Sequence, residues 1–169
     1  MILSPNDMHV YEVLARLAPF ASSYLGIGIQ AGECVRTVVV ANPLISRLVL
    51  CDTWGLHLGS IGHTNHDHVE EKLRDAGYRG EIEYLDGPSQ HLVPLLEEQF
   101  DLAYVDGDHN VEPAFDDMSN TWPLVIKAMV VHDVFMPTTA IALQKFIATV
   151  PDVKMVIHSG GTGTAVFYR

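Results

Sequence analysis

Apolar residues follow two periodicities in alternating segments of the chain, and this pattern predicts alternating strands and helices. Short, nearly unbroken apolar runs are typical of strands buried on both faces of a sheet. We predict such strands over residues 22–29, 47–52, 81–85, 100–105 and 128–133. Between them apolar residues recur at three- and four-residue intervals, which predicts helices within 1–20, 32–41, 62–80, 89–99, 111–125 and 138–149.

Capping and turn residues set the ends of several of these elements. Ser4 followed by Pro5 is a typical helix start, and Asn65 or Asp67 is expected to cap the helix within 62–80. Asp108 is expected to cap the helix over 111–125, whose apolar stripe is Val111, Phe115, Met118, Trp122 and Val125. Near the end, residues 153–159 and 164–169 flank a Gly-rich turn and predict a β-hairpin.

These elements predict the α/β class: a Rossmann-like, doubly wound, mainly parallel sheet with helices on both faces and a C-terminal antiparallel hairpin. We expect residues 1–169 to form a single domain, with the helix of residues 1–20 packing on the sheet.

Composition and charge narrow the classes of partner that the protein is expected to bind. The sequence is 48% hydrophobic and 18% charged, as in globular proteins. A net charge of −11 disfavours nucleic acids and anionic membranes, because phosphate binding depends on Lys and Arg. Neither a signal peptide nor a membrane-spanning run is apparent, and Cys34 and Cys51 lack CxxC spacing. We therefore expect a cytoplasmic protein that binds neither nucleic acid nor a membrane surface. The chain leaves little length for a substrate lid, so a second copy in a homo-oligomer could complete its site.

Carboxylates follow four of the five predicted parallel strands. They are Asp52, Asp86, Asp106 and Asp133. In an open parallel sheet, ligands bind beyond the carboxyl ends of the strands, so these acids are expected to converge on one rim. Taken alone, each acid more often serves a turn or a helix cap than a ligand, and it is the set that points to a site.

A glycine-rich turn after the first strand points to a particular ligand. Gly26 and Gly28 let backbone approach a ligand closely, and Asp52 follows Gly28 by 24 residues. That offset is near the one at which an acid binds ribose hydroxyls. The combination indicates an adenosine-type ligand.

Four segments together resemble class I S-adenosylmethionine-dependent methyltransferases. The segments are YLGIGIQAGECV (24–35), LVLCD (48–52), FDLAYVDGDHNVEPAFDDMSNTWPLV (100–125) and MVVHDV (129–134), and the resemblance extends from Tyr24 to Arg169. The last two segments are similar to the branch of small O-methyltransferases that use a divalent metal. The chain departs from the family pattern at Gly26 and Pro88, where an acid is usual, and at 126–129, where Pro-Gly-Gly is usual.

The resemblance implies an enzyme that uses S-adenosylmethionine, with Mg²⁺ or Mn²⁺ as a second cofactor, to methylate a small hydroxylated molecule. It implies the metal ligands Asp106, His132 and Asp133, and the imidazole shifts the expected preference toward Mn²⁺. His109 is the expected proton acceptor, with Asp106 also catalytic. The implied cofactor-binding residues are Gly26, Gly28, Asp52, Thr53, Trp54, Asp86 and Ser89.

Three other interpretations remain open at this stage. His63, His66 and His68, with His57 nearby, suggest a zinc site, although their spacing fits no closed structural pattern. The departures at Gly26 and Pro88 suggest a degenerate, non-catalytic module that binds an adenosyl cofactor. The rim carboxylates also suit a metal-dependent hydrolase.

Overall fold

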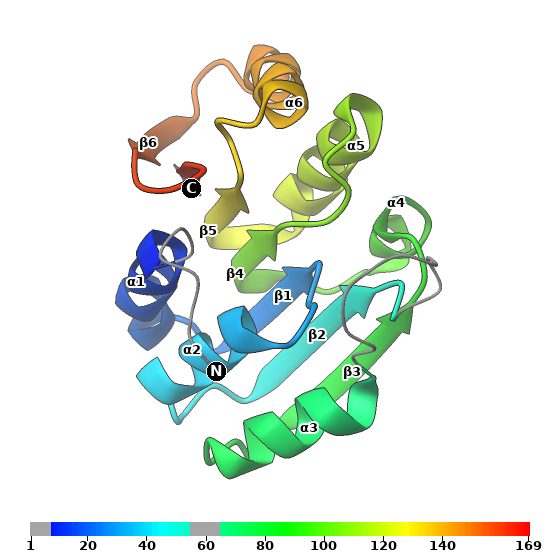
Figure 1. The fold of residues 1–169 in the computed structure, drawn as a ribbon, viewed down its shortest axis with the longest axis vertical. Helices are drawn as coiled ribbons and strands as arrows, with labels where there is room; N and C mark the ends of the chain where they lie inside the picture. The colour runs from blue at the N-terminus through cyan, green and yellow to red at the C-terminus, as the bar shows by residue number, and fades with distance from the viewer. Residues whose placement is uncertain (1–7, 55–64) are drawn as a thin grey trace.

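The computed structural model describes residues 8–54 and 65–169 (Figure 1). Its strands are β1 (Ser23–Ile27), β2 (Arg47–Asp52), β3 (Glu81–Asp86), β4 (Phe100–Val105), β5 (Val125–His132), β6 (Lys154–His158) and β7 (Thr164–Tyr168). Its α-helices are α1 (Met8–Leu17), α2 (Glu33–Ala41), α3 (His66–Asp75), α4 (Ser89–Leu92), α5 (Val111–Thr121) and α6 (Pro137–Thr149). Short 3-10 helices cover Ala18–Phe20, Val93–Leu95 and Trp122–Leu124.

The strands form one seven-stranded sheet in the order β3-β2-β1-β4-β5-β7-β6. The first five strands pair in parallel, and β7 is antiparallel to both β5 and β6. The α/β class, the parallel sheet and the terminal antiparallel pair are confirmed. The strand order reverses between β1 and β4, which is the switch point where ligands bind in such sheets.

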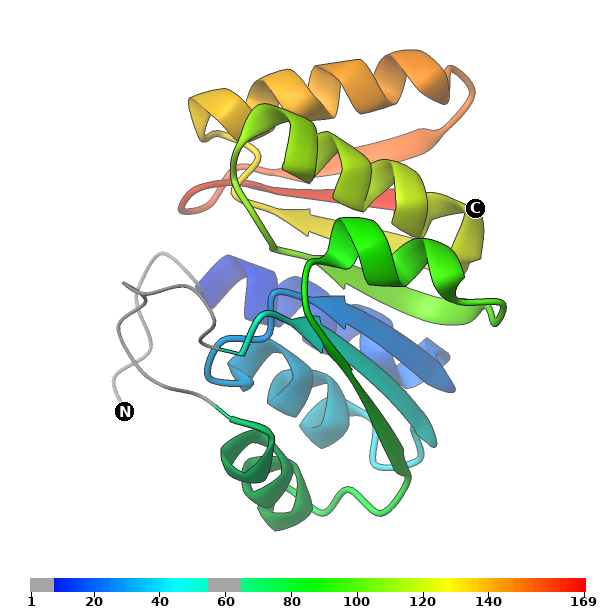
Figure 2. The same ribbon diagram turned by 90° about the vertical axis from the view of Figure 1, so that its right-hand side faces the viewer.

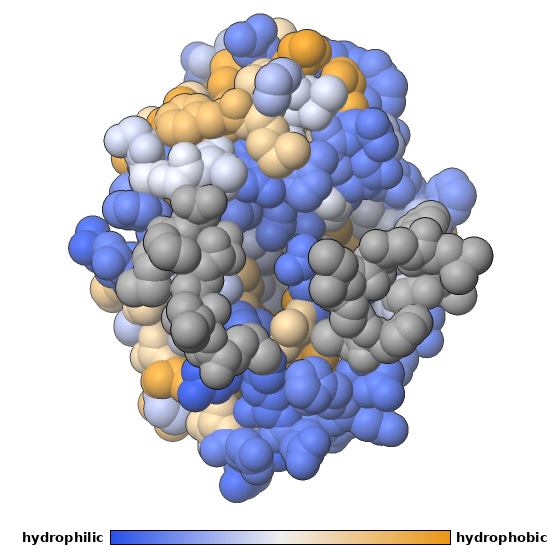
Figure 3. Space-filling model, in the orientation of Figure 1, coloured by the Kyte–Doolittle hydropathy of each residue, from blue (hydrophilic) through white to orange (hydrophobic). Residues whose placement is uncertain are grey.

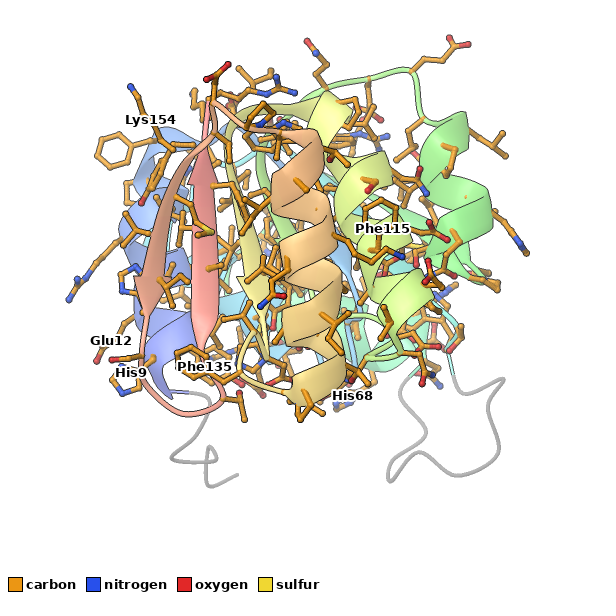
Figure 4. The ribbon with its side chains drawn as sticks, turned by 90° about the horizontal axis from the view of Figure 1, so that it is seen from above. His9, Glu12, His68, Phe115, Phe135 and Lys154 are labelled. Atoms are coloured by element: carbon orange, nitrogen blue, oxygen red, sulfur yellow. The ribbon has the colours of Figure 1, made fainter. Side chains whose placement is uncertain are left out.

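Helices cover both faces of the sheet (Figure 2), as the view from above also shows (Figure 4). One buried cluster joins residues of α1, α2 and α3 to alternate residues of the strands, among them Tyr24 and Tyr104. The other joins α5 and α6 to the remaining alternate residues. Every residue of β4 is buried, because this central strand packs against both layers.

The N-terminal helix α1 packs mainly on α2 and also touches β5. Val10 and Leu14 of α1 are buried in the first cluster. The assignment of residues 1–169 to one domain stays a prediction, and the predicted cap at Ser4 lies outside the described residues. Within the two described ranges, no helix is long and apolar enough to cross a membrane.

Prolines and glycines explain most differences from the predicted boundaries. The helix predicted over 111–125 ends at Thr121, and a 3-10 turn containing Pro123 leads into β5, which begins three residues before the predicted strand. A 3-10 turn containing Pro94 likewise follows the short α4. Strand β1 stops before Gly28, whose φ of 76° is not a strand conformation.

One predicted cap is correct and another is wrong. The side chain of Asn65 caps α3 by accepting the His68 amide at 2.9 Å. Asp108 does not cap α5: its carboxylate accepts the backbone amide of Asn110, and Asn110 is the N-cap residue. Two residues separate Asp108 from the helix, so its bond to Asn110 orders the loop before the helix.

Candidate functional site

The loops after β1 and β4 touch at the switch point. The amide of Asp106 donates to the Ile27 carbonyl at 2.9 Å. A Cβ atom on Gly28 would lie 1.8 Å from the Asp106 carbonyl oxygen, and Gly28 also has a φ of 76°. Only glycine fits there, because the Asp106 carbonyl leaves no space for a Cβ atom and the positive φ disfavours a side chain. The face of the molecule seen in Figure 3 is hollowed near its centre.

Asp52, at the end of β2, organises the glycine-rich turn. One oxygen of its carboxylate accepts the amides of Ile29 and Gln30, at 2.7 and 3.0 Å. The other oxygen accepts the Trp54 amide at 3.0 Å. A carboxylate has about four acceptor sites, so about one remains for a ligand hydroxyl.

Backbone strain gathers at the same rim. Gln30, Trp54 and Asp133 have φ values of 46°, 48° and 56°, although none is glycine. They follow β1, β2 and β5. Left-handed backbone at non-glycine residues is uncommon and tends to cluster at functional sites. The three residues therefore mark the carboxyl edge as the functional edge of the sheet.

A cavity of about 340 Å³ lies beyond the ends of β2 and β3. It is lined by Thr53, Trp54, Asn65, His66, Asp67 and Asp86. His66 stacks on Tyr84 with ring centroids 4.1 Å apart, and its Nε2 lies 2.7 Å from Asp86 Oδ1. Three residues expected to bind cofactor, Thr53, Trp54 and Asp86, thus share one pocket.

Ser89 faces inward. Its hydroxyl donates to Asp117 Oδ1 at 2.5 Å, and Gln90 Nε2 donates to the same oxygen at 2.8 Å. Asp117 is 1% exposed, and burial raises the pKa of its carboxyl to about 7 despite these two bonds. The predicted contact of Ser89 with cofactor stays a prediction.

Beside the switch point, two carboxylates and two imidazoles converge. His109 Nε2 lies 2.7 Å from Asp133 Oδ2 and 3.4 Å from Asp106 Oδ1. His132 Nδ1 lies 3.5 Å from Asp106 Oδ1 and 3.4 Å from Asp133 Oδ1. Tyr104 donates its hydroxyl to the other oxygen of Asp106, Oδ2, at 2.7 Å. The sequence-predicted catalytic and metal residues are therefore neighbours.

The pKa values within this cluster reflect its opposite charges. Contact with Asp106 and Asp133 raises the pKa of His109 to about 10. Burial lowers the pKa of His132, but the same two carboxylates outweigh it and raise that pKa to about 10. Burial acts to raise the pKa of Asp106 and Asp133, and the neighbouring histidines outweigh it and hold both below their usual range.

The donor atoms fit a divalent cation. His109 Nε2 and His132 Nδ1 are buried atoms without a hydrogen bond of good geometry, although carboxylate oxygens surround them. One ligand atom from each of Asp106, His109 and Asp133 lies within 4.8 Å of the others. These nitrogen and oxygen atoms converge within ion-pair distance of one another, and they are of the types that bind divalent transition-metal ions.

The rival zinc hypothesis gains no support from the described part of the chain. His57 and His63 lie outside it, and His66 and His68 belong to no group there that brings three metal-binding side chains together. His66 stacks on Tyr84, and His68 serves the helix cap through its backbone.

Sequence reasoning missed two features of the rim. Asp117 was not expected at the site, because an acid in the middle of a helix is usually solvent-exposed. His109 was expected to move a proton, not to join the two carboxylates; its spacing of three residues from Asp106 was the available signal.

A sheet of five parallel strands in this order, with an antiparallel β7 beside β5, a glycine-rich turn after β1 and an acid at the end of β2, is the fold of class I S-adenosylmethionine-dependent methyltransferases. A family model described as a methyltransferase domain matches residues 25–134, more than half of the chain. The chain therefore belongs to this methyltransferase family.

Solved structures share the fold at low sequence identity. The O-methyltransferase NovP is 16% identical with a TM-score of 0.75, over 94% of this chain and 78% of NovP. TomG, an O-methyltransferase of Streptomyces achromogenes solved with SAM, is 18% identical with a TM-score of 0.69, over 99% and 81%. The SAH-bound methyltransferase PaMTH1 of Podospora anserina is 14% identical with a TM-score of 0.66, over 97% and 77%. No curated protein matches the sequence significantly.

Proposed function

We propose that this methyltransferase transfers the methyl group of S-adenosylmethionine to a hydroxyl oxygen of a small molecule, and that a divalent cation assists. The observation that carries the proposal is the contact between the two loops: Gly28, in the glycine-rich turn, touches Asp106, in the cluster of carboxylates and imidazoles. A cofactor bound along one loop would thus present its methyl group beside the other.

The cofactor would lie along the glycine-rich turn. Gly28 leaves the backbone bare there, and Asp52 keeps about one acceptor site for a ribose hydroxyl. The cavity lined by Trp54, His66 and Asp86 offers aromatic surface and a carboxylate to a flat, amino-bearing base. Structures of the similar TomG and PaMTH1 contain SAM and SAH, which agrees with this assignment.

The cation would be held by Asp106, His132 and Asp133. A bound divalent cation supplies Lewis acidity, which lowers the pKa of a substrate hydroxyl. Asp106 and Asp133 supply the negative charge for binding it, and Tyr104 fixes the orientation of the Asp106 carboxylate. Without a cation, Asp106 would still orient the substrate, but His109 is a poor proton acceptor near neutral pH, because contact with Asp106 and Asp133 raises its pKa to about 10.

One observation favours a second candidate, a module that binds cofactor without turnover. A Cβ atom on Gly26 would lie 2.8 Å from the Ile29 side chain and 2.9 Å from the Tyr24 ring. These side chains fill the space of the acid that is usual there in the family. Loss of that acid would remove one contact to the methionine end of the cofactor.

Methyl transfer from isotopically labelled S-adenosylmethionine to a panel of catechols, other phenols and sugars tests the proposal. Asp106→Ala is expected to abolish transfer and to leave the affinity for S-adenosylhomocysteine nearly unchanged. Asp152→Ala, an exposed acid before β6, is the control and keeps both. Equal loss of transfer and affinity in Asp106→Ala would contradict the assignment, and binding with no transfer across the panel would favour the second candidate.

A further inference from the structure

We infer that the cation site is a mixed centre of two imidazoles and two carboxylates, in which His109 is a metal ligand and not the proton acceptor, and that it selects a transition metal ion over Mg²⁺. The inference rests on the metal-assisted form of the proposed function. It adds a fourth ligand to the predicted set and a specificity that the set alone does not define.

The position of His109 carries the first step. Its Nε2 lies 2.7 Å from Asp133 Oδ2 and 3.4 Å from Asp106 Oδ1, so the nitrogen faces both predicted carboxylate ligands. That nitrogen is buried and makes no hydrogen bond of good geometry, while the side chain as a whole is 37% exposed. A proton acceptor must direct its free nitrogen at the substrate. The Nε2 atom of His109 is directed at the two carboxylates instead.

His132 supplies the second, independent observation. It is only 8% exposed, and its Nδ1 has no hydrogen-bond partner. This nitrogen lies 3.5 Å from Asp106 Oδ1 and 3.4 Å from Asp133 Oδ1. A buried polar atom without a partner is costly and calls for an explanation such as an ion. A cation shared with Asp106 and Asp133 satisfies it.

Tyr104 gives the two carboxylate oxygens of Asp106 different roles. Its hydroxyl occupies Oδ2, which leaves Oδ1 as the oxygen that faces both histidines. The ion pairs described for Asp106 and Asp133 come from histidines alone among residues 8–54 and 65–169, with no Lys or Arg partner. A cation there competes only with the protons of the two imidazoles, not with the permanent charge of a Lys or Arg side chain.

The donor types decide which metal is favoured. Mg²⁺ and Ca²⁺ prefer oxygen ligands, and Mg²⁺ usually keeps several waters, whereas imidazole suits Zn²⁺, Co²⁺ and other transition ions. Mn²⁺ accepts both oxygen and nitrogen donors, which makes it a suitable spectroscopic probe. Two nitrogens among four ligands therefore favour transition ions, and removing one nitrogen is expected to reduce that advantage.

The experiment compares wild type with His109→Asn and with the control His91→Asn, which changes an exposed histidine of α4. Calorimetric titrations with Mn²⁺, Co²⁺ and Mg²⁺ give the affinities. Electron spin echo spectra of bound Mn²⁺ report directly on nitrogen ligands, which a merely structural role of His109 would not alter. S-adenosylhomocysteine binding is measured in parallel on the same proteins.

We expect wild type to bind Mn²⁺ and Co²⁺ more tightly than Mg²⁺ and to show imidazole nitrogen modulation. His109→Asn should weaken Mn²⁺ and Co²⁺ binding by at least about tenfold, change Mg²⁺ binding much less, and reduce the modulation, while His91→Asn changes none of these. Unchanged modulation in His109→Asn, or equal loss of all three metals, overturns the inference. Absence of any metal binding overturns it together with the metal-assisted form, and S-adenosylhomocysteine binding then shows whether the methyltransferase assignment stands.

Discussion

Asp117→Asn should make the protein more stable relative to wild type as the pH rises. The Asp117 carboxyl is 1% exposed, and burial raises its pKa from 3.8 to about 7. Between these values the folded protein holds a proton that the unfolded chain has released. The free energy of unfolding contributed by this group therefore falls as pH rises through that window.

The size of the effect follows from the shift. Each pKa unit corresponds to about 1.4 kcal/mol, so the penalty is absent near pH 4 and reaches about 4 kcal/mol above pH 7. Asparagine carries no charge, and its carbonyl oxygen still accepts from Ser89 and Gln90 as Oδ1 does. The amide nitrogen of the asparagine takes the place of Asp117 Oδ2, which has no hydrogen-bond partner, so the amide lacks an acceptor. That cost does not change with pH.

Urea unfolding of both proteins between pH 4 and pH 8 measures this difference. We expect the free energy of unfolding of Asp117→Asn, minus that of wild type, to increase with pH by whole kilocalories per mole and not by tenths of one. Asp75→Asn, at the exposed end of α3, controls for the general loss of a charge. A difference that stays flat across the window would refute the reasoning that Asp117 is a buried acid with a raised pKa.

Two further predictions use matched pairs of residues. Tyr104→Phe removes the hydroxyl that donates to Asp106, so it should lower the free energy of unfolding by about 1.5–3 kcal/mol and weaken Mn²⁺ binding. Tyr24 is equally buried but its hydroxyl has no partner, so Tyr24→Phe should lower the stability less and leave Mn²⁺ binding unchanged. Gly28→Ala should abolish S-adenosylhomocysteine binding, measured by calorimetry, because the new Cβ atom would meet the Asp106 carbonyl. Gly77 has a φ of 95° and open space around it, so Gly77→Ala should lower the stability by only about 1 kcal/mol through backbone strain and keep binding. Equal effects within either pair would contradict the contacts assigned to its first member.

The hydrophobic pattern was sufficient to predict the sheet and its helices. Buried parallel strands are continuous apolar runs, and these runs identified β1 to β5 within a few residues. The carboxyl ends of parallel strands meet at one edge, so the convergence of Asp52, Asp86, Asp106 and Asp133 on one rim was also predictable. Which of these acids touch one another depends on loop conformation, which periodicity does not report.

The position of Asp117 shows where the pattern fails. The predicted stripe of α5 ran through Phe115 and Met118, whereas the buried face contains Ala114, Asp117, Met118 and Thr121. An acid occupies this face because Ser89 and Gln90 bind it across the gap from α4. Such a pair forms between segments distant in sequence. A single sequence contains no local signal for it.

His109 shows the same limit in the functional site. Its type and its place after β4 suggested a proton acceptor. The structure brings it to Asp133, whose φ of 56° turns the backbone directly after β5. A left-handed residue that is not glycine has no reliable signature in one sequence.

The measurement that tests the central claim most directly is calorimetric titration of the protein with S-adenosylhomocysteine, with and without Mn²⁺. We predict micromolar binding that Asp52→Ala weakens by about 1–3 kcal/mol, since that carboxylate orders the glycine-rich turn and keeps an acceptor site for ribose. Asp75→Ala should bind as wild type does. Absence of binding under every metal condition, or equal affinity in Asp52→Ala, would contradict an adenosyl site at this edge of the sheet.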